Sequence, residues 1–415
     1  MNRLFLVSIL TLLLSAPVQS GYFLAVITDL QTYWPAAELE KPAYLQTIID
    51  PVFNTRITRI VGDPGDLIPN LSGEVWADEQ LRHGYSKRQP WNADGTMLYL
   101  DRHDPELWLD GNTYAPLFTR KDKPGTSLRW STTEPRIMFY LGRDGNEHLG
   151  RWDVVANTSE ELVDLRAYRD ISFGEGEGNF TWDSRKVAVY GIRRSDDHPV
   201  IVVVDVVARS KGPDIDLSDL VELKNCTISP LGNYIVIGAD LDGSGSDRIQ
   251  VRSAATGAVL WEEERYGLPS HFDTQIDEQG DEVIVGVGKT APYNGMVIKR
   301  RLADGAITVL VDQGYASHTS GRAIGRKNWV YVTYQLRDNS SWWPFRNEIV
   351  AVKLDGSRIE RLGNLHAIDF DYLAESHGCP SPDGTRVIFA SDWEHGDFPV
   401  QAYVIDLRDK VIPAR

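Results

Sequence analysis

A short turn that recurs along the chain constrains the fold more than any other feature. Each copy is rich in Asp, Pro, Gly and other polar residues and leads into a β-branched or aromatic run, which indicates strands joined by tight turns. The copies recur every ~40 to 58 residues, a spacing typical of four-stranded propeller blades. We therefore predict an all-β fold, a seven-bladed β-propeller. The seven copies are Trp91–Gly95, Trp130–Pro135, Trp182–Arg185, Ser229–Gly232, Ile276–Gly280, Ala323–Arg326 and Ser381–Gly384.

The segments at the two ends of the chain complete the predicted domain organisation. The last unit lacks an outermost strand, and Thr55–Val61 could provide it, which would close the ring and remove open sheet edges. Residues 1–20 have a short basic start, an apolar run and small residues at the end, which predicts a secretory signal peptide. We expect residues 21–54 to form an N-terminal arm and residues 55–415 to form the propeller as one domain.

The composition limits the partners. The formal net charge of −16 disfavours nucleic acid and anionic membranes. No later segment is long enough to span a bilayer, so we expect a secreted or periplasmic protein, and a monomer. An anionic substrate would need a local basic pocket to overcome the overall repulsion.

Three histidines and a cysteine occupy matching places in the last three units. His271, His318 and His377 each come at the start of a predicted innermost strand, and Cys379 follows His377 by two residues. Side chains two residues apart on a strand share one face, so His377 and Cys379 can bind the same metal ion. Three nitrogens and one sulfur suit tetrahedral Zn²⁺.

The role of such a metal stays open at this point. Four protein ligands would close the site and make the zinc structural, whereas a free His271 would leave the site open for catalysis. The alternative is a set of polar residues that line the channel and bind water. The sequence also leaves a Ca²⁺ site open.

The two cysteines could instead form a disulfide in an exported protein. Cys226 lies in an apolar run that reads as a strand, so we expect it to be a buried thiol in the core. We favour Cys379 as a metal ligand over a Cys226–Cys379 bridge.

A basic and aromatic segment leads into the first turn. His83 should lie near His103, which ends the returning strand, so the two form a candidate functional pair. Tyr85, Lys87 and Arg88 would suit an anionic sugar, with cations for a carboxylate or sulfate and a ring for stacking. The alternative is a solvated edge whose histidines only form hydrogen bonds.

A second set of cations lies in the next two units. Tyr190, Arg193 and Arg194 end a predicted second strand, and Arg143 ends the equivalent strand one unit earlier. Guanidinium groups there could hold a carboxylate bidentately. The alternative is that these are loop arginines in solvent.

These residues together resemble a known family. The His83-Gly84-Tyr85-Ser86 stretch before Pro90-Trp91-Asn92, the partner His103 and the late His/His/His-x-Cys set resemble the propeller-fold polysaccharide lyases, most closely the ulvan lyases. The resemblance implies a single catalytic domain that cleaves a sulfated, uronic-acid-containing polysaccharide by β-elimination. It also implies roles for individual residues: base and acid for His83 and His103, carboxylate neutraliser for Arg194 or Arg193, and supporting donors for Tyr190 and Tyr85.

Two other interpretations remain. The more distant oligogalacturonate lyases share a channel metal held by histidines of late blades, but they end in His-x-His where this chain has His377-Gly378-Cys379. That resemblance implies a metal that binds the substrate carboxylate, with His271 or an arginine as base. The third interpretation is a non-enzymatic, TolB-like envelope propeller that binds protein.

Overall fold

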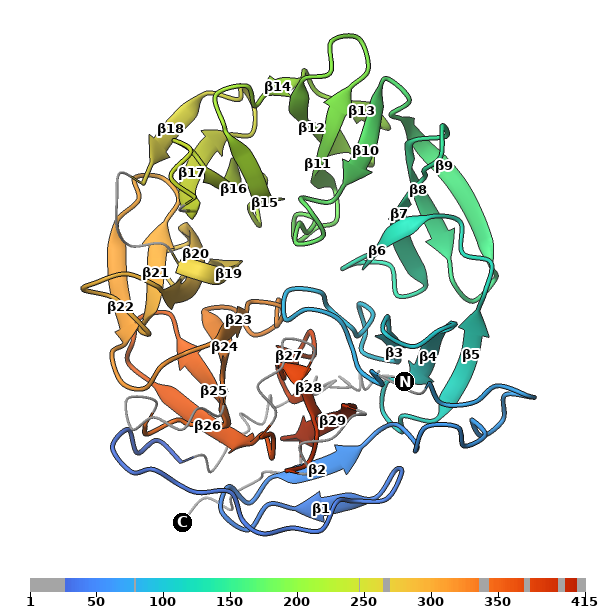
Figure 1. Cartoon of the computed structure of the whole chain (residues 1–415), viewed down its shortest axis with the longest axis vertical. Helices are drawn as coiled ribbons and strands as arrows, with labels where there is room; N and C mark the ends of the chain where they lie inside the picture. Colours follow the sequence, from blue (N-terminus) through green and yellow to red (C-terminus); the bar gives the residue numbers. More distant parts are fainter. Residues whose placement is uncertain are drawn as a thin grey trace, which may run out of the picture.

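The computed structural model describes residues 27–77, 80–245, 247–263, 269–335, 343–368, 374–394 and 400–408. The predicted signal peptide, residues 1–20, lies outside the described residues. The described chain forms seven antiparallel sheets arranged as blades around a central hub (Figure 1). This confirms the predicted all-β, seven-bladed propeller.

The first four blades follow one another around the ring. The first contains β3 (Met97–Leu100), β4 (Glu106–Asp110) and β5 (Pro116–Arg120). The second contains β6 (Thr126–Trp130), β7 (Ile137–Leu141), β8 (His148–Asp153) and β9 (Thr158–Asp164). The third contains β10 (Tyr168–Ser172), β11 (Lys186–Arg193), β12 (Pro199–Asp205), β13 (Ser210–Lys211) and β14 (Ile215–Asp216). The fourth contains β15 (Glu222–Ile228), β16 (Tyr234–Asp240), β17 (Asp247–Ser253) and β18 (Val259–Glu262).

The last three blades complete the ring. The fifth contains β19 (Pro269–Ile276), β20 (Glu282–Gly288), β21 (Val297–Arg301) and β22 (Ile307–Val311). The sixth contains β23 (His318–Ser320), β24 (Trp329–Tyr334), β25 (Glu348–Lys353) and β26 (Ile359–Asn364). The seventh contains β27 (Cys379–Pro380), β28 (Arg386–Ser391) and β29 (Gln401–Asp406), together with β2 (Arg56–Arg59) and β1 (Thr47–Ile49) from the N-terminal side.

The seventh blade is closed by the two ends of the chain. β2 pairs with β29 from Arg56↔Asp406 to Arg59↔Tyr403, and β1 adds a further strand outside β2. The strand expected within Thr55–Val61 therefore takes the predicted position. Joining the first and last strands in one sheet removes the exposed edges that an open ring would leave.

Burial follows the position of a strand within its blade. All seven residues of β20 are buried, because both faces of a middle strand pack against neighbouring blades. By contrast, the first four residues of β9, on the outer edge of its blade, are exposed. The core therefore consists of apolar layers between blades, and the polar groups of the hub lie among the innermost strands.

The recurring turns show why the repeat is visible in the sequence. In the last one, Ser381 Oγ donates to Asp383 at 2.6 Å and accepts the Arg386 amide at 3.1 Å, which fixes the reversal between β27 and β28. Gly384 has φ 72°, and a Cβ there would meet the Tyr331 hydroxyl at 2.5 Å. Only glycine therefore fits this position.

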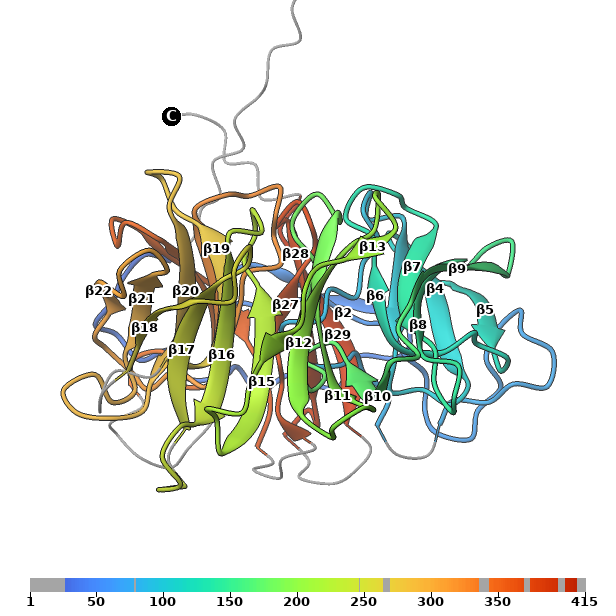
Figure 2. The ribbon, with the colours of Figure 1, turned by 90° about the horizontal axis from the view of Figure 1, so that it is seen from above.

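The ring has two faces, which Figure 2 shows edge-on. The recurring turns lie on one face. The innermost strands begin, and the second strands end, on the other, which we call the site face. Within the described residues, no helix has the length and apolar character needed to cross a membrane.

The segment of residues 81–90 runs through the hub instead of forming a strand, and Figure 1 shows it inside the ring. Its side chains reach blades far away in the sequence. Tyr85 bonds to His271 in the fifth blade, and Gln89 Nε2 donates to the carbonyls of Arg322 and Pro380 in the sixth and seventh. We call residues 81–90 the hub segment.

Candidate active site and metal centre

Three of the histidines singled out by the sequence meet on the site face of the hub. The rings of His271 and His318 lie 4.4 Å apart between centroids, and those of His318 and His377 lie 4.3 Å apart. They come from the starts of the innermost strands in the fifth, sixth and seventh blades. The repeat therefore brings together residues that are far apart in the chain.

At two of these histidines the backbone leaves the extended conformation, which changes the direction of the ring. His271 has φ 50° and His377 has φ 46°, in the left-handed region that non-glycine residues rarely adopt. His271 also lies in a bulge, since the β19–β20 register shifts between Ser270 and Asp273. Bulges and strained residues of this kind re-aim side chains and are concentrated at functional sites.

A carboxylate completes the group. Glu375 Oε2 lies 3.4 Å from His318 Nε2 and 3.5 Å from His377 Nε2. One ligand atom from each of these three residues lies within 4.8 Å of the others. We call His271, His318, His377, Glu375 and Tyr85 the histidine cluster.

Tyr85 enters the same cluster from the hub segment. Its hydroxyl is 2.8 Å from His271 Nδ1, and its ring lies 5.5 Å from that of His318 and 4.8 Å from that of His377. The sequence assigned Tyr85 to the sugar and the histidines to the metal. The structure joins them in one site.

The imidazoles of the cluster are neutral at ordinary pH. Burial lowers the pKa of His271 to about 4, and the nearby Lys289 and Lys87 ammonium groups add to this. Burial also holds the pKa values of His318 and His377 well below their usual range, with a further contribution from neighbouring histidines. Neutral imidazole is the form that binds metals and accepts protons.

The residues present fit a divalent metal. His318 Nε2 is buried without a hydrogen-bond partner although it lies 3.4 Å from a carboxylate oxygen of Glu375. Ligands about 2.1 Å from a tetrahedral ion would lie about 3.4 Å from one another, close to the separations seen here. Two or three imidazoles with one carboxylate suit several divalent transition metals, so a possible His/Glu metal site is present and its ion is not fixed.

Cys379 lies outside this group. Its thiol is 3.6 Å from Ser320 Oγ and 3.7 Å from the Arg88 carbonyl, and burial raises its pKa to about 12. The rule that placed it beside His377 assumes an extended chain, but His377 is left-handed and β27 begins only at Cys379. Glu375, which the sequence indicated only as a residue that could support His377 from outside the ligand set, faces two of the imidazoles in place of the thiol. Its position two residues before His377 was the only signal.

Both cysteines are free and buried, so the disulfide alternative is excluded. Cys226 packs in the core of the fourth blade, as predicted, and burial raises its pKa to about 12.

His83 and His103 have separate surroundings. His83 is fully buried and its Nε2 donates to the His377 carbonyl at 2.7 Å. His103 Nδ1 donates to the Pro105 carbonyl at 2.7 Å, and its ring lies 6.0 Å from that of Trp76. Within the described residues no hydrogen bond or ring contact joins the two imidazoles. His83 supports the backbone of the histidine cluster, and a joint acid–base role for the two stays a prediction.

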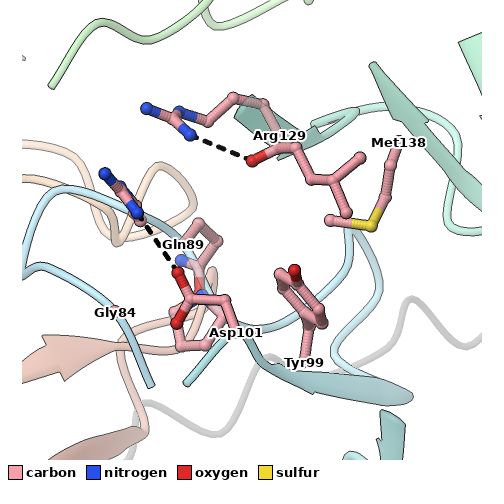
Figure 3. Close-up of a pocket in the computed structure, with 9 residues that line it drawn as sticks. Gly84, Gln89, Tyr99, Asp101, Arg129 and Met138 are labelled. Carbon is pink, nitrogen blue, oxygen red and sulfur yellow. Dashed lines mark hydrogen bonds and ion pairs between the residues drawn. The ribbon is translucent and has the colours of Figure 1, made fainter. Parts of the chain in front are cut away.

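Lys87 and Arg88 are turned toward protein partners in the hub. The Lys87 ammonium pairs with Glu177 and lies 4.4 Å from the Phe272 ring centroid. Arg88 Nη1 lies 3.3 Å from Asp101 Oδ2. Figure 3 shows Asp101 and Arg129 beside a small cavity of about 20 Å³ next to Gly84, large enough for about one water molecule.

Arg193 and Arg194 lie in a different electrostatic setting. Arg193 bonds to Asp196 at 2.7 Å and to Asp214 at 3.0 Å, while Arg194 bonds to Glu147 at 3.0 Å. We call these two arginines and three carboxylates the arginine cluster. A substrate carboxylate would have to displace these partners, so the predicted role of the arginines stays a prediction.

The remaining two candidates also lie outside the histidine cluster. Arg143 is exposed and forms an ion pair with Asp144 at 3.4 Å. Tyr190 is half-buried and packs against the core of the fourth blade, where burial raises its pKa. No contact of either with the histidine cluster is present among the described residues.

The sequence matches no protein-family description and no curated protein. Among solved structures, the chain is similar to an oligogalacturonate lyase from Vibrio parahaemolyticus, with 14% identity, a TM-score of 0.62, and coverage of 88% of this chain and 97% of the other. It is less similar to TolB from Acinetobacter baumannii, with 12% identity, a TM-score of 0.40, and coverage of 83% and 86%. At these identities the likeness extends to the propeller fold.

Proposed function

We propose that this protein is a lyase that cleaves uronic-acid polymers or oligomers by β-elimination at the histidine cluster. The observation that carries the proposal is the convergence of three neutral imidazoles, a carboxylate and a phenol on the site face. Such a reaction needs a base for the proton beside the uronate carboxylate, an acid for the leaving oxygen, and neutralisation of the carboxylate.

The Tyr85–His271 pair can serve as both base and acid. With its proton on Nδ1, His271 donates to the Tyr85 oxygen and keeps a lone pair on Nε2. That Nε2 takes the proton from C5 of the uronate, a C4=C5 double bond forms, and the C4–O4 bond breaks. The Tyr85 hydroxyl protonates the departing oxygen, and the proton on Nδ1 then passes to the phenolate. The imidazole is now neutral with its proton on Nε2, and exchange with solvent, which removes that proton and returns one to Nδ1, restores the starting tautomer.

The low pKa of His271, about 4, keeps this imidazole unprotonated at neutral pH, and it also makes Nε2 a weaker base than that of a free histidine. His318, His377 and Glu375 would hold a divalent cation beside the pair. The chemistry that such a cation supplies is neutralisation of a substrate carboxylate, which makes the adjacent C–H more acidic.

This proposal departs from the roles that the ulvan-lyase resemblance implied. It gives the base to His271 and the supporting role to His83, because His83 Nε2 already donates to the His377 carbonyl. The likeness in fold to an oligogalacturonate lyase supports a lyase that acts on uronates, and the contact of His271 with Tyr85 is the reason to give His271 the role of base. An ulvan-like substrate, secretion and a monomeric state remain predictions from the sequence.

The test is an activity screen on pectate fragments, ulvan and other uronans, read by the ultraviolet absorbance of the unsaturated product. We expect turnover on at least one of them after loading with a divalent metal. Tyr85→Phe and His271→Ala should each lower kcat by about 100- to 10,000-fold. The matched control is His198→Asn, since this histidine is exposed and lies beside Asp216 outside the cluster.

Two results would contradict the proposal. Unchanged turnover in both variants would remove the Tyr85–His271 pair from the chemistry. Silence of the metal-loaded protein on every uronan would instead favour a propeller that only binds its partner.

A further inference from the structure

An exposed lysine and a tyrosine stand beside the histidine cluster on the site face. Lys289 directly follows β20, whose last residue, Gly288, pairs with Pro269 at the start of β19. Tyr315 lies three residues before His318. The same strand ends that present His271 and His318 therefore present Lys289 and Tyr315.

The two side chains form a unit. Lys289 Nζ lies 5.7 Å from the centroid of the Tyr315 ring. The Tyr315 hydroxyl donates to Asn294 at 3.3 Å, and Gly295 approaches the ring so closely that a Cβ there would lie 2.6 Å from it. Contacts on the hydroxyl and on the ring thus hold Tyr315 in place, with the ammonium nearby.

Two lysines lie near the cluster, and they differ in exposure. The Lys87 side chain is buried. Lys289 is exposed and can meet an incoming anion at the surface.

We propose that Lys289 and Tyr315 form a subsite for the sugar next to the reacting uronate, with the ring under the sugar face and the ammonium on its anionic group. This inference rests on the proposed function, since it places the reacting sugar at the Tyr85–His271 pair. The recognised group is a carboxylate in a homouronan or a sulfate ester in a sulfated polymer. Lys289 is a specificity-determining residue in this scheme and takes no part in proton transfer.

The experiment compares Lys289→Met and Lys289→Arg with Lys121→Met in the metal-loaded protein. Lys121 is a matched control because it is exposed and pairs with Glu74. We expect Lys289→Met to raise KM for a trimeric uronate about three- to tenfold with kcat nearly unchanged, and the effect to shrink as salt is added. Lys289→Arg should restore most of the loss.

Calorimetric binding of trigalacturonate and of a sulfated ulvan trisaccharide separates the two sources of the anion. A loss of affinity in Lys289→Met confined to one ligand identifies the anionic group that the subsite takes. Equal binding of both ligands by the wild type and Lys289→Met overturns the subsite, even if the enzyme is active. If turnover is absent but Lys289→Met still weakens binding, the subsite stands and the proposed reaction fails.

Discussion

The histidine cluster and the arginine cluster contain the residue types expected at a lyase site, but they differ in what surrounds them. In the histidine cluster, His318 Nε2 faces Glu375 at 3.4 Å without forming a hydrogen bond. In the arginine cluster, Arg193 already bonds to Asp196 and Asp214. The first set has binding capacity left for a ligand, whereas the guanidinium groups of the second already bond to carboxylates of the protein.

The comparison teaches that a cation in the sequence is not evidence of an anion site until its carboxylate partners are known. The chain has 59 acidic against 43 basic residues, so a surface arginine readily finds an internal partner. An imidazole nitrogen that faces a carboxylate oxygen without bonding to it is a more specific sign, because one ion between the two would satisfy both groups.

The largest expected effect is on metal affinity, which should depend on Glu375 and not on Cys379. Glu375→Ala should weaken the binding of a divalent metal by at least about 100-fold, because it removes an oxygen that faces two imidazoles. Cys379→Ala should leave the affinity within about twofold. Competition against a chromophoric chelator measures both, and the reverse order would restore the cysteine as the ligand.

A second prediction concerns the stability of the fold in acid, which depends on a buried imidazole that stays neutral. Burial lowers the pKa of His83 to about 4 in the folded protein, against 6.5 for the unperturbed group. The unfolded chain therefore takes up the proton first, so this contribution to stability is full above pH 6.5 and is lost as the pH falls toward 4. It amounts to about 3 kcal/mol.

The measurement is the free energy of unfolding by denaturant between pH 7 and pH 4.5. His83→Gln keeps a donor for the His377 carbonyl and cannot titrate, so its stability should fall less steeply in this window. Equal slopes for the two proteins would show that His83 is not buried in its neutral form.

The smallest effect is expected in the arginine cluster. Arg194→Met should keep turnover within about twofold and lower the melting temperature, since it leaves the buried Glu147 carboxylate without its exposed arginine partner. Steady-state kinetics with the substrate found in the screen provides the test. A large fall in kcat with the fold intact would return the carboxylate-binding role to this arginine.

The sequence predicted the propeller, its closing strand and the meeting of three histidines because these depend on a repeat that places equivalent residues at equivalent positions. It placed Cys379, and not Glu375, among the residues that face the imidazoles because the rule that residues two apart share a face fails at the left-handed His377. It paired His83 with His103 because residues 81–90 were taken for a hairpin strand. The hub segment instead crosses to the late blades, a tertiary contact that no local pattern encodes.

The most direct test of the central claim is a crystal structure of the protein loaded with zinc or manganese, with anomalous diffraction measured at the metal edge. We expect one strong peak within about 2.0–2.3 Å of His318 Nε2, His377 Nε2 and a Glu375 oxygen. A peak on Cys379 Sγ, or no peak between these three side chains at saturating metal, would contradict the account.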